Sequence, residues 1–249
     1  MVIEIKGQTI HYNILGNGLP LIILHGLYLD SISMIRAVES PSVQLQGFKR
    51  IYIDMPGMGQ SPRHELENNS DTMLDLLCEL ITVLINDHPF IVIGYSYGGY
   101  IAQGIAKRFL HQIIGEVLIC PVIISQPEKR IKTSVTHQDI DENFFNSLDE
   151  KTQKKLLTKM VVINERTYHR SEADFSRAIA LADKEFLKEL AEKQYSSTYI
   201  ESNKSIHQHK SLIFLGYQDT SVGYQDMLDR LYIYPNATVN LLSNASHSN

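Results

Sequence analysis

The residues with the clearest chemical potential form the pentapeptide Gly94-Tyr95-Ser96-Tyr97-Gly98. It follows the apolar run 90–93 and opens a helical pattern, which is the context in which G-x-S-x-G forms a nucleophile elbow. A serine at the tip of so tight a turn needs glycines two residues to either side, because larger side chains would collide with the strand and helix behind it. The pattern therefore predicts that Ser96 is a nucleophile, in preference to a surface serine in a Gly-rich turn.

A serine hydroxyl is a weak nucleophile at neutral pH, and it needs a base that a third group orients. Asp219 and His247 are the best candidates, since each follows an apolar run, at 212–215 and 239–242. Open α/β sheets place ligand sites at such strand ends. Asp226 and Asp229 compete with Asp219, but they fall in a predicted helix over 222–231, where exposure is the ordinary expectation.

The chain has ten histidines. His247 is preferred as the base because it follows the last predicted strand. The others are interpreted as surface or structural residues, including His207 and His209, which lie beside a helical segment.

His25-Gly26-Leu27 follows another apolar run, at 21–24. A turn there can direct a backbone N–H at the oxygen that becomes negative during acyl transfer. We expect the two N–H groups of this oxyanion hole to belong to Leu27 and Tyr97. His25 is interpreted as a structural residue of the loop, and Tyr95 and Gly26 are assigned to substrate contact.

Apolar and alternating runs predict the strands that position these groups. Residues 2–5 and 8–15 alternate and predict an antiparallel hairpin, whereas the later runs are continuously apolar, as in strands covered on both faces. Helical spacing separates them, for example at Met73, Leu77 and Leu80 after the cap-type residue Asn69. The fold class is therefore α/β, with a mostly parallel central sheet of about eight strands. Its later strands are predicted at 21–24, 50–53, 90–93, 117–119, 212–215 and 239–242.

One stretch interrupts this alternation. Residues 122–209 contain amphipathic helical segments and no convincing strand, so they are predicted to form an inserted, all-helical cap or lid. Residues 1–121 and 210–249 then make up the core domain. The sequence does not indicate which cap residues would line a pocket.

Composition narrows the classes of partner. The chain has 249 residues, with 43% hydrophobic and 20% charged side chains, which are ordinary globular values. A net charge of −5 without a basic run gives no indication of nucleic-acid or membrane binding, so a small-molecule partner is expected. The start of the chain lacks a signal-peptide pattern, which favours a cytoplasmic location. Cys78 and Cys120 are expected to be free, buried thiols, and no cofactor or metal site is predicted. No oligomeric state is predicted.

Taken together, His25-Gly26, Asp54-x-Pro56-Gly57-x-Gly59-x-Ser61, the elbow with Gly99, Asp219 and His247 resemble the α/β-hydrolase superfamily. The resemblance is to its subgroup with a helical cap after the sixth strand. It implies that Ser96 is the nucleophile, His247 the general base and then acid, Asp219 the orienting acid, and Leu27 and Tyr97 the oxyanion hole. Family members usually have glycine before the histidine and a helix after it. Here Ser246 precedes His247 and the sequence ends at Asn249, so His247 is expected to be prone to fraying.

The resulting functional hypothesis is a serine hydrolase of the carboxylesterase type that acts through an acyl-enzyme on Ser96. Two alternatives stay open on the same scaffold. One is a C–C bond hydrolase or lyase, in which Ser96 and His247 handle protons around a ketone. The other is a non-catalytic receptor for a small ligand, because a fold does not fix a function.

Overall fold

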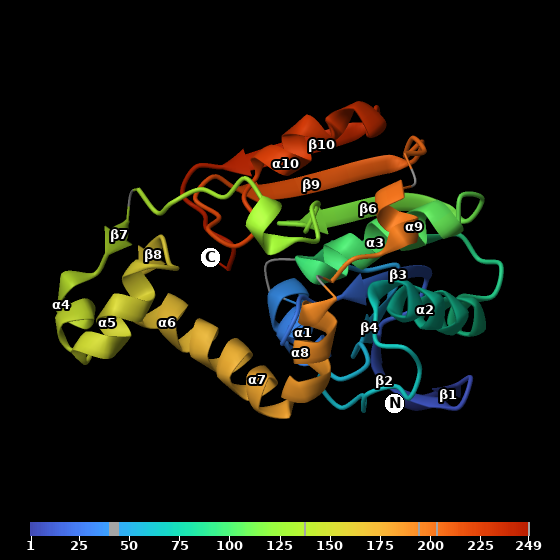
Figure 1. Cartoon of the computed structure of the whole chain (residues 1–249), viewed down its shortest axis with the longest axis horizontal. Coiled ribbons are helices and arrows are strands. Elements are labelled where there is room, and N and C mark those ends of the chain that lie inside the picture. The colour runs from blue at the N-terminus through green and yellow to red at the C-terminus, as the bar shows by residue number, and fades with distance from the viewer. Residues whose placement is uncertain (40–44, 137, 194, 203, 249) are drawn as a thin grey trace.

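An eight-stranded sheet lies at the centre of the molecule (Figure 1), in the order β1-β2-β4-β3-β5-β6-β9-β10. The computed structural model describes residues 1–39, 45–136, 138–193, 195–202 and 204–248. Antiparallel pairing is confined to β1 with β2 and β2 with β4, and the remaining neighbours are parallel, as predicted. The strands are β1 (Val2–Ile5), β2 (Gln8–Leu15), β3 (Leu19–Leu24), β4 (Phe48–Ile53), β5 (Phe90–Tyr95), β6 (Ile113–Ile119), β9 (Lys210–Gly216) and β10 (Ala237–Leu242).

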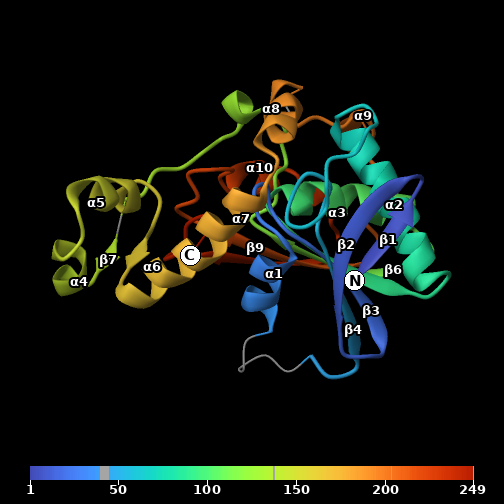
Figure 2. The ribbon, with the colours of Figure 1, turned by 90° about the horizontal axis from the view of Figure 1, so that it is seen from below.

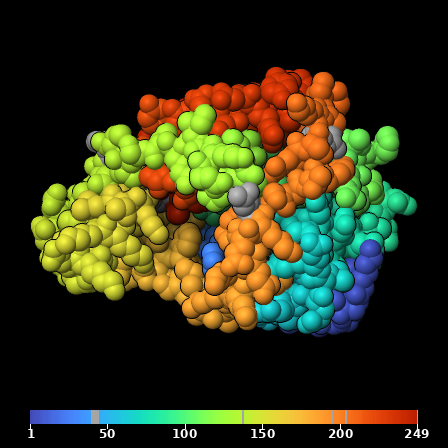
Figure 3. Space-filling view, viewed as in Figure 1, coloured from blue at the N-terminus to red at the C-terminus, as the bar shows by residue number. Residues whose placement is uncertain are grey.

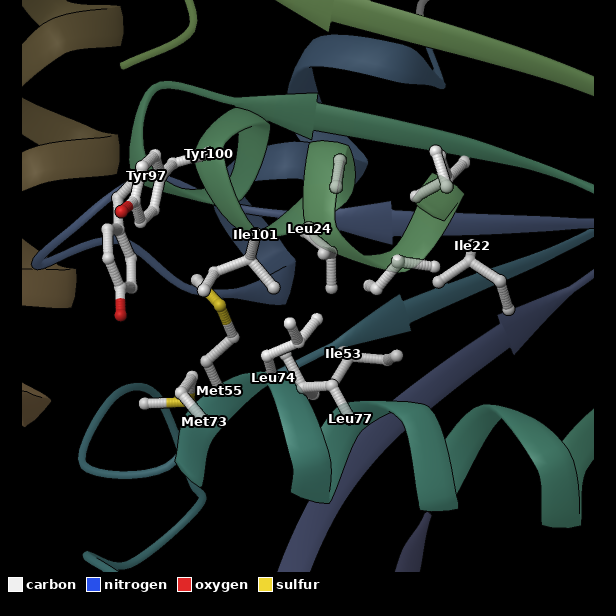
Figure 4. Packing of buried hydrophobic residues seen from close by; sticks show 14 of the residues in the cluster. Ile22, Leu24, Ile53, Met55, Met73, Leu74, Leu77, Tyr97, Tyr100 and Ile101 are labelled. Carbon is white, nitrogen blue, oxygen red and sulfur yellow. The ribbon is translucent and has the colours of Figure 1, made fainter. Parts of the chain in front are cut away.

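Helices cover both faces of the sheet, which explains why the parallel strands are continuously apolar. Alternate residues of β3 point to opposite faces. Ile22 and Leu24 belong to a large core with α2 and α3 (Figure 4), whereas Leu21 and Ile23 pack with Met34 of α1 on the other face (Figure 2). The helices of this part of the chain are α1 (Ser31–Val38), α2 (Ser70–Ile85), α3 (Tyr97–Arg108), α10 (Gln225–Asp229) and the 3₁₀ turn η3 (Leu231–Ile233).

The start of α2 illustrates how the local sequence sets an element. The side chain of Asn69 accepts a hydrogen bond of 2.8 Å from the backbone N–H of Thr72, which satisfies one of the free donors of the first turn. Met73, Leu77 and Leu80 are fully buried along one face of the helix. The cap and the apolar face of this helix were both predicted from the sequence.

Between β6 and β9 the chain leaves the sheet and forms a separate group of helices, at the left of Figure 1 and across its front. The prediction of an all-helical segment is wrong in one detail, because Asp139 and Ile140 pair with Val162 and Ile163 as two short parallel strands. Two residues are too few to produce an alternating pattern. The elements are the 3₁₀ turn η1 (Pro127–Lys129), β7 (Asp139–Ile140), α4 (Glu142–Asn146), α5 (Glu150–Leu157), β8 (Val162–Ile163), α6 (Glu165–Ser171), the π-helix η2 (Glu172–Ser176), α7 (Arg177–Leu181), α8 (Lys184–Glu192) and α9 (Thr198–Ser202).

Ion pairs connect this segment to the residues around the sheet. Arg177 lies 2.6 Å from the buried carboxylate of Asp30, which also caps α1. Arg63, in the loop after β4, contacts Asp183 at 2.8 Å, at the start of α8. The division into core and cap at 121/122 and 209/210 stays a prediction. None of the helices in the described ranges combines the length and apolar character needed to cross a bilayer.

Candidate active site

Ser96 occupies a sharp turn between β5 and α3. Its backbone has φ +55° and ψ −116°, which is a sparsely populated conformation for a residue with a side chain. A Cβ at Gly94 would lie 2.3 Å from the carbonyl oxygen of Gly98, and one at Gly98 would lie 2.4 Å from the carbonyl oxygen of His25. The two glycines of the pentapeptide are therefore required by close backbone packing around the serine.

The three side chains selected from the sequence lie in one hydrogen-bonded row. Ser96 Oγ is 2.9 Å from Nε2 of His247, and Nδ1 of His247 is 2.7 Å from Oδ2 of Asp219. The other oxygen of Asp219 accepts from the backbone N–H groups of Ser221 and Val222, at 2.8 and 2.9 Å. A carboxylate beside Nδ1 fixes the proton on that nitrogen, which leaves Nε2 free to accept from Ser96.

Asp219 is fully buried, so its ionisation depends on these partners. Burial raises the pKa of the Asp219 carboxyl, but the bond and charge of His247 and the two backbone donors outweigh it and hold the pKa below the ordinary value. The acid therefore stays charged at neutral pH.

His247 is held in place by its neighbours. The hydroxyl of Tyr95 donates to the carbonyl oxygen of His247 at 2.9 Å, and the two rings lie 5.2 Å apart. The backbone N–H of Gln218 donates to the carbonyl oxygen of Ala245 at 3.0 Å. These contacts connect the segment before and at His247 to β5 and to the loop that carries Asp219.

The loop after β3 lies directly against the nucleophile. A Cβ at Gly26 would be 3.1 Å from Cβ of Ser96, so the loop approaches as closely as glycine allows. Among the residues that the structure describes, the backbone N–H groups of Leu27 and Tyr97 donate to no protein acceptor. Both predicted oxyanion donors are thus unengaged next to Ser96.

His25 has the structural role expected of it. Its Nδ1 lies 2.8 Å from the carbonyl oxygen of Gly26, and its Nε2 accepts from the backbone N–H of Met55 at 3.0 Å. Burial lowers the pKa of the His25 imidazole, against smaller opposing effects that include the charge of Asp54. The neutral ring joins the loop after β3 to the Pro-Gly turn after β4, where Ser61 Oγ donates to the carbonyl oxygen of Asp54 at 2.6 Å.

A cavity of about 460 Å³ lies beside the imidazole, where Figure 3 shows a hollow with C-terminal residues in dark red. Tyr95 lines this cavity, as does His247, whereas Ser96 and Gly26 lie outside its lining. The hydroxyl of Tyr97 is buried against Ser70 Oγ at 2.8 Å. The sequence did not indicate which residues of the segment 122–209 would line a pocket. In the structure, the residues of this segment that line the cavity are Val162, Thr167, Arg170, Ser171, Asp174 and Phe175.

Cys120 lies next to Asp219 and His247, which the sequence did not predict. It follows β6 with φ +41°, and its Sγ lies within 4.8 Å of ligand atoms of Asp219 and His247. Burial, with the charge of Asp219, raises the pKa of the Cys120 thiol to about 12, so the thiol stays protonated. Cys120 and Cys78 are both free thiols, and Cys78 is partly exposed.

Comparisons with known proteins agree with this architecture. The family model for the alpha/beta hydrolase fold matches residues 20–249. An α/β-superfamily hydrolase from Oenococcus oeni PSU-1 superimposes with a TM-score of 0.87 at 34% identity, over 99% of this chain and 91% of that one. A thermophilic esterase from Thermogutta terrifontis, at 16% identity, has a TM-score of 0.69 over 99% of this chain and 91% of that one, which shows the fold alone.

Curated relatives match over shorter stretches. A pimeloyl-[acyl-carrier protein] methyl ester esterase from Shewanella woodyi is 32% identical over 45% of this chain and 40% of its own length. The protein of the same name from Legionella pneumophila is 26% identical over 60% of this chain and 56% of its own length. The chain thus spans about half the length of these relatives. From the family model, which covers nearly the whole sequence, we conclude that the chain belongs to the α/β-hydrolase family.

Proposed function

We propose that this protein is a serine hydrolase that cleaves a small-molecule carboxylic ester through an acyl-enzyme on Ser96. The observation that carries the proposal is the continuous row from Ser96 Oγ through His247 to Asp219, with distances of 2.9 and 2.7 Å. Such a row can activate a hydroxyl at neutral pH, which a lone serine cannot do.

In the first half of the proposed reaction, Ser96 Oγ attacks the ester carbonyl carbon while its proton passes to Nε2 of His247. The carbonyl oxygen becomes an anion, and the N–H groups of Leu27 and Tyr97 stabilise it. One such donor is worth on the order of 3 kcal/mol of transition-state stabilisation. The tetrahedral intermediate then collapses, and His247 returns the proton to the departing alcohol.

In the second half, water enters and His247 removes a proton from it as it attacks the acyl carbon. The bond to Ser96 Oγ breaks, the carboxylic acid is released, and the serine recovers its proton from Nε2. Asp219 stays ionised throughout, because its role is to keep Nδ1 protonated and to stabilise the imidazolium.

Two further features support an ester as the substrate. The lining of the cavity beside His247 is mostly apolar, with Leu29, Met34 and Phe175 among its residues, and this suits an uncharged acyl or alcohol group. Two curated relatives are named for the hydrolysis of a methyl ester. The proposal includes the segment 122–209 as a cap over the site, a small-molecule substrate and a cytoplasmic location.

The test combines active-site labelling with a panel of p-nitrophenyl esters of graded acyl length. We expect a fluorophosphonate to modify Ser96 and the short esters to be hydrolysed. Both the labelling and the hydrolysis should be lost in Ser96→Ala. Ser211→Ala is a matched control, since Ser211 is also buried but lies on β9 away from the row. Labelling of Ser96 without turnover of any ester would contradict the proposal and favour C–C bond chemistry or a ligand receptor.

A further inference from the structure

A second cluster of buried ionisable side chains lies where β6 and β9 meet. Glu116 is in the middle of β6 and pairs with Ser211 of β9, so that His207 and His209, just before β9, lie beside it. Nε2 of His209 is 3.1 Å, and Nδ1 of His207 is 3.2 Å, from the same oxygen of Glu116. The exposed fractions of the three side chains are 0% for Glu116, 1% for His207 and 5% for His209.

The hydrogen bonding of this cluster is incomplete. Oε1 of Glu116 and both ring nitrogens of His207 are buried without a hydrogen-bond partner, because the 3.2 Å approach of Nδ1 is not aligned as a hydrogen bond. A buried polar atom without a partner costs about 1–3 kcal/mol, and more when the group is charged. Three such atoms in one cluster indicate that a further group belongs among them.

The donor atoms indicate the charge of that group. A carboxylate oxygen offers a negative charge with lone pairs, and an imidazole nitrogen without a proton offers a lone pair, so a group that all three side chains bind would be a cation.

We propose that Glu116, His207 and His209 bind one divalent transition-metal ion, for which zinc fits best. Two imidazole nitrogens and a carboxylate oxygen are a donor set that zinc uses in proteins. All three ligand atoms lie within 4.8 Å of one another. The two contacts of 3.1 and 3.2 Å approach the separation of roughly 3.3 Å that tetrahedral zinc imposes on its ligands.

The surroundings suit such a site. The ring of His207 stacks on Tyr234 with centroids 4.3 Å apart, which fixes its orientation. A surface groove lined by Glu116, Gln208 and His209 gives an ion and its water access from solvent. The ligands need little rearrangement, so the site is largely formed before the ion enters.

The ion would have a structural role. Glu116 lies within β6, four residues before Cys120, which directly follows the strand and neighbours the catalytic row. At the rise of a strand, Glu116 and Cys120 are about 13 Å apart along the chain. His207 and His209 belong to the segment through which the chain returns from 122–209 to the sheet. Metal binding would thus link the segment that contains His207 and His209 to β6.

The other group of three potential ligands is a poorer competitor. Cys120, Asp219 and His247 also lie within 4.8 Å of one another, but the acid and the imidazole are already hydrogen bonded. Since burial raises the pKa of Cys120 to about 12, binding there would require an unfavourable thiolate.

The first test measures zinc binding to the whole chain by calorimetry and by metal content after dialysis. We expect one zinc per chain and a rise in Tm on binding. Glu116→Gln and His209→Gln should each weaken binding by more than about 100-fold. His169→Gln is the control, because His169 lies exposed beside Glu165 and should leave binding unchanged. Absence of saturable binding, or wild-type binding in both folded cluster variants, would overturn the proposal.

The second test uses cobalt(II) as a spectroscopic probe and needs no cluster variant. Coordination by two imidazoles and a carboxylate gives visible d–d bands without the intense near-ultraviolet band of a cobalt–thiolate bond. We expect this spectrum in wild type and an identical one in Cys120→Ser. A thiolate band that disappears in Cys120→Ser would place the metal at the other cluster and refute the assignment.

Discussion

Two buried carboxylates, one in the central sheet and one in a loop that follows it, contact histidines, and they differ in how completely they are hydrogen bonded. Asp219 has a partner for each oxygen, namely His247 for one and two backbone N–H groups for the other. Glu116 has one oxygen near two imidazoles and the other without a partner. The bonding of Asp219 is thus completed within the protein, whereas the unpaired atoms around Glu116 are the observation on which the proposed metal site rests.

The difference originates in the backbone. Asp219 lies in a tight loop after β9, where the N–H groups two and three residues later are free to donate to its side chain. Glu116 lies within β6, between two parallel neighbours, where the ladders use the backbone groups. A loop can complete the bonding of a carboxylate by itself, and a central strand cannot.

The largest expected effect comes from removing the charge at each carboxylate in turn. Asp219→Asn should lower kcat by about 10⁴-fold, because an amide no longer enforces the tautomer that the base requires. Glu116→Gln should leave kcat unchanged and lose zinc binding. Steady-state kinetics on the best ester of the panel measures both, and a comparable loss of kcat in the two variants would end the distinction between the clusters.

A pair of glycine substitutions tests how tightly the backbone is packed at the elbow and beside Glu116. Gly98→Ala should destabilise the fold by about 1–3 kcal/mol, because its Cβ would lie 2.4 Å from the carbonyl oxygen of His25. Gly115→Ala, next to Glu116, places its Cβ 3.4 Å from the nearest atom, of Ile91. It should keep the stability or raise it by up to about 1 kcal/mol. Denaturant unfolding measures both, and equal losses would contradict this assignment of tight packing to the elbow.

His25 sharpens the comparison, because it is a buried histidine with both nitrogens bonded and a lowered pKa. Such a group takes up a proton on unfolding once the pH falls below the ordinary value of about 6.5. Its contribution to the free energy of unfolding is thus complete above that pH and declines below it, by at most about 1.4 kcal/mol per pH unit. His25→Gln should reduce this slope in unfolding titrations between pH 7.5 and 5.5, and an unchanged slope would argue that the ring is not kept neutral by the fold.

The smallest expected effect concerns the tyrosines that touch each cluster. Tyr95→Phe removes the donor to the carbonyl oxygen of His247, a bond worth about 1 kcal/mol, and should lower kcat several-fold. Tyr234→Phe keeps the ring that stacks on His207 and should leave kcat at the wild-type value. An unaltered kcat in Tyr95→Phe would mean that this bond does not position the imidazole.

The sequence predicted the sheet. It also predicted that Ser96, Asp219 and His247 are catalytic, because each follows an apolar run that is expected to be a strand. The structure places these three side chains in contact. The cluster at Glu116 had no comparable signal, since one glutamate within an apolar strand and two histidines near helical residues resemble ordinary surface positions. Only the parallel pairing of β6 with β9 brings them together. The two strands β7 and β8 were missed because they have only two residues each.

Ser96 and His247 are 151 positions apart along the chain, and this separation has a consequence for how the protein folds. The hydroxyl and the imidazole can meet only after β6, β9 and β10 have joined the sheet in register, with the long excursion through 122–209 in between. Contacts of such long range form late, because the entropy of closing large loops must be overcome first. Turnover would therefore recover after helical structure during refolding, which makes catalysis a sensitive indicator of a completely assembled sheet.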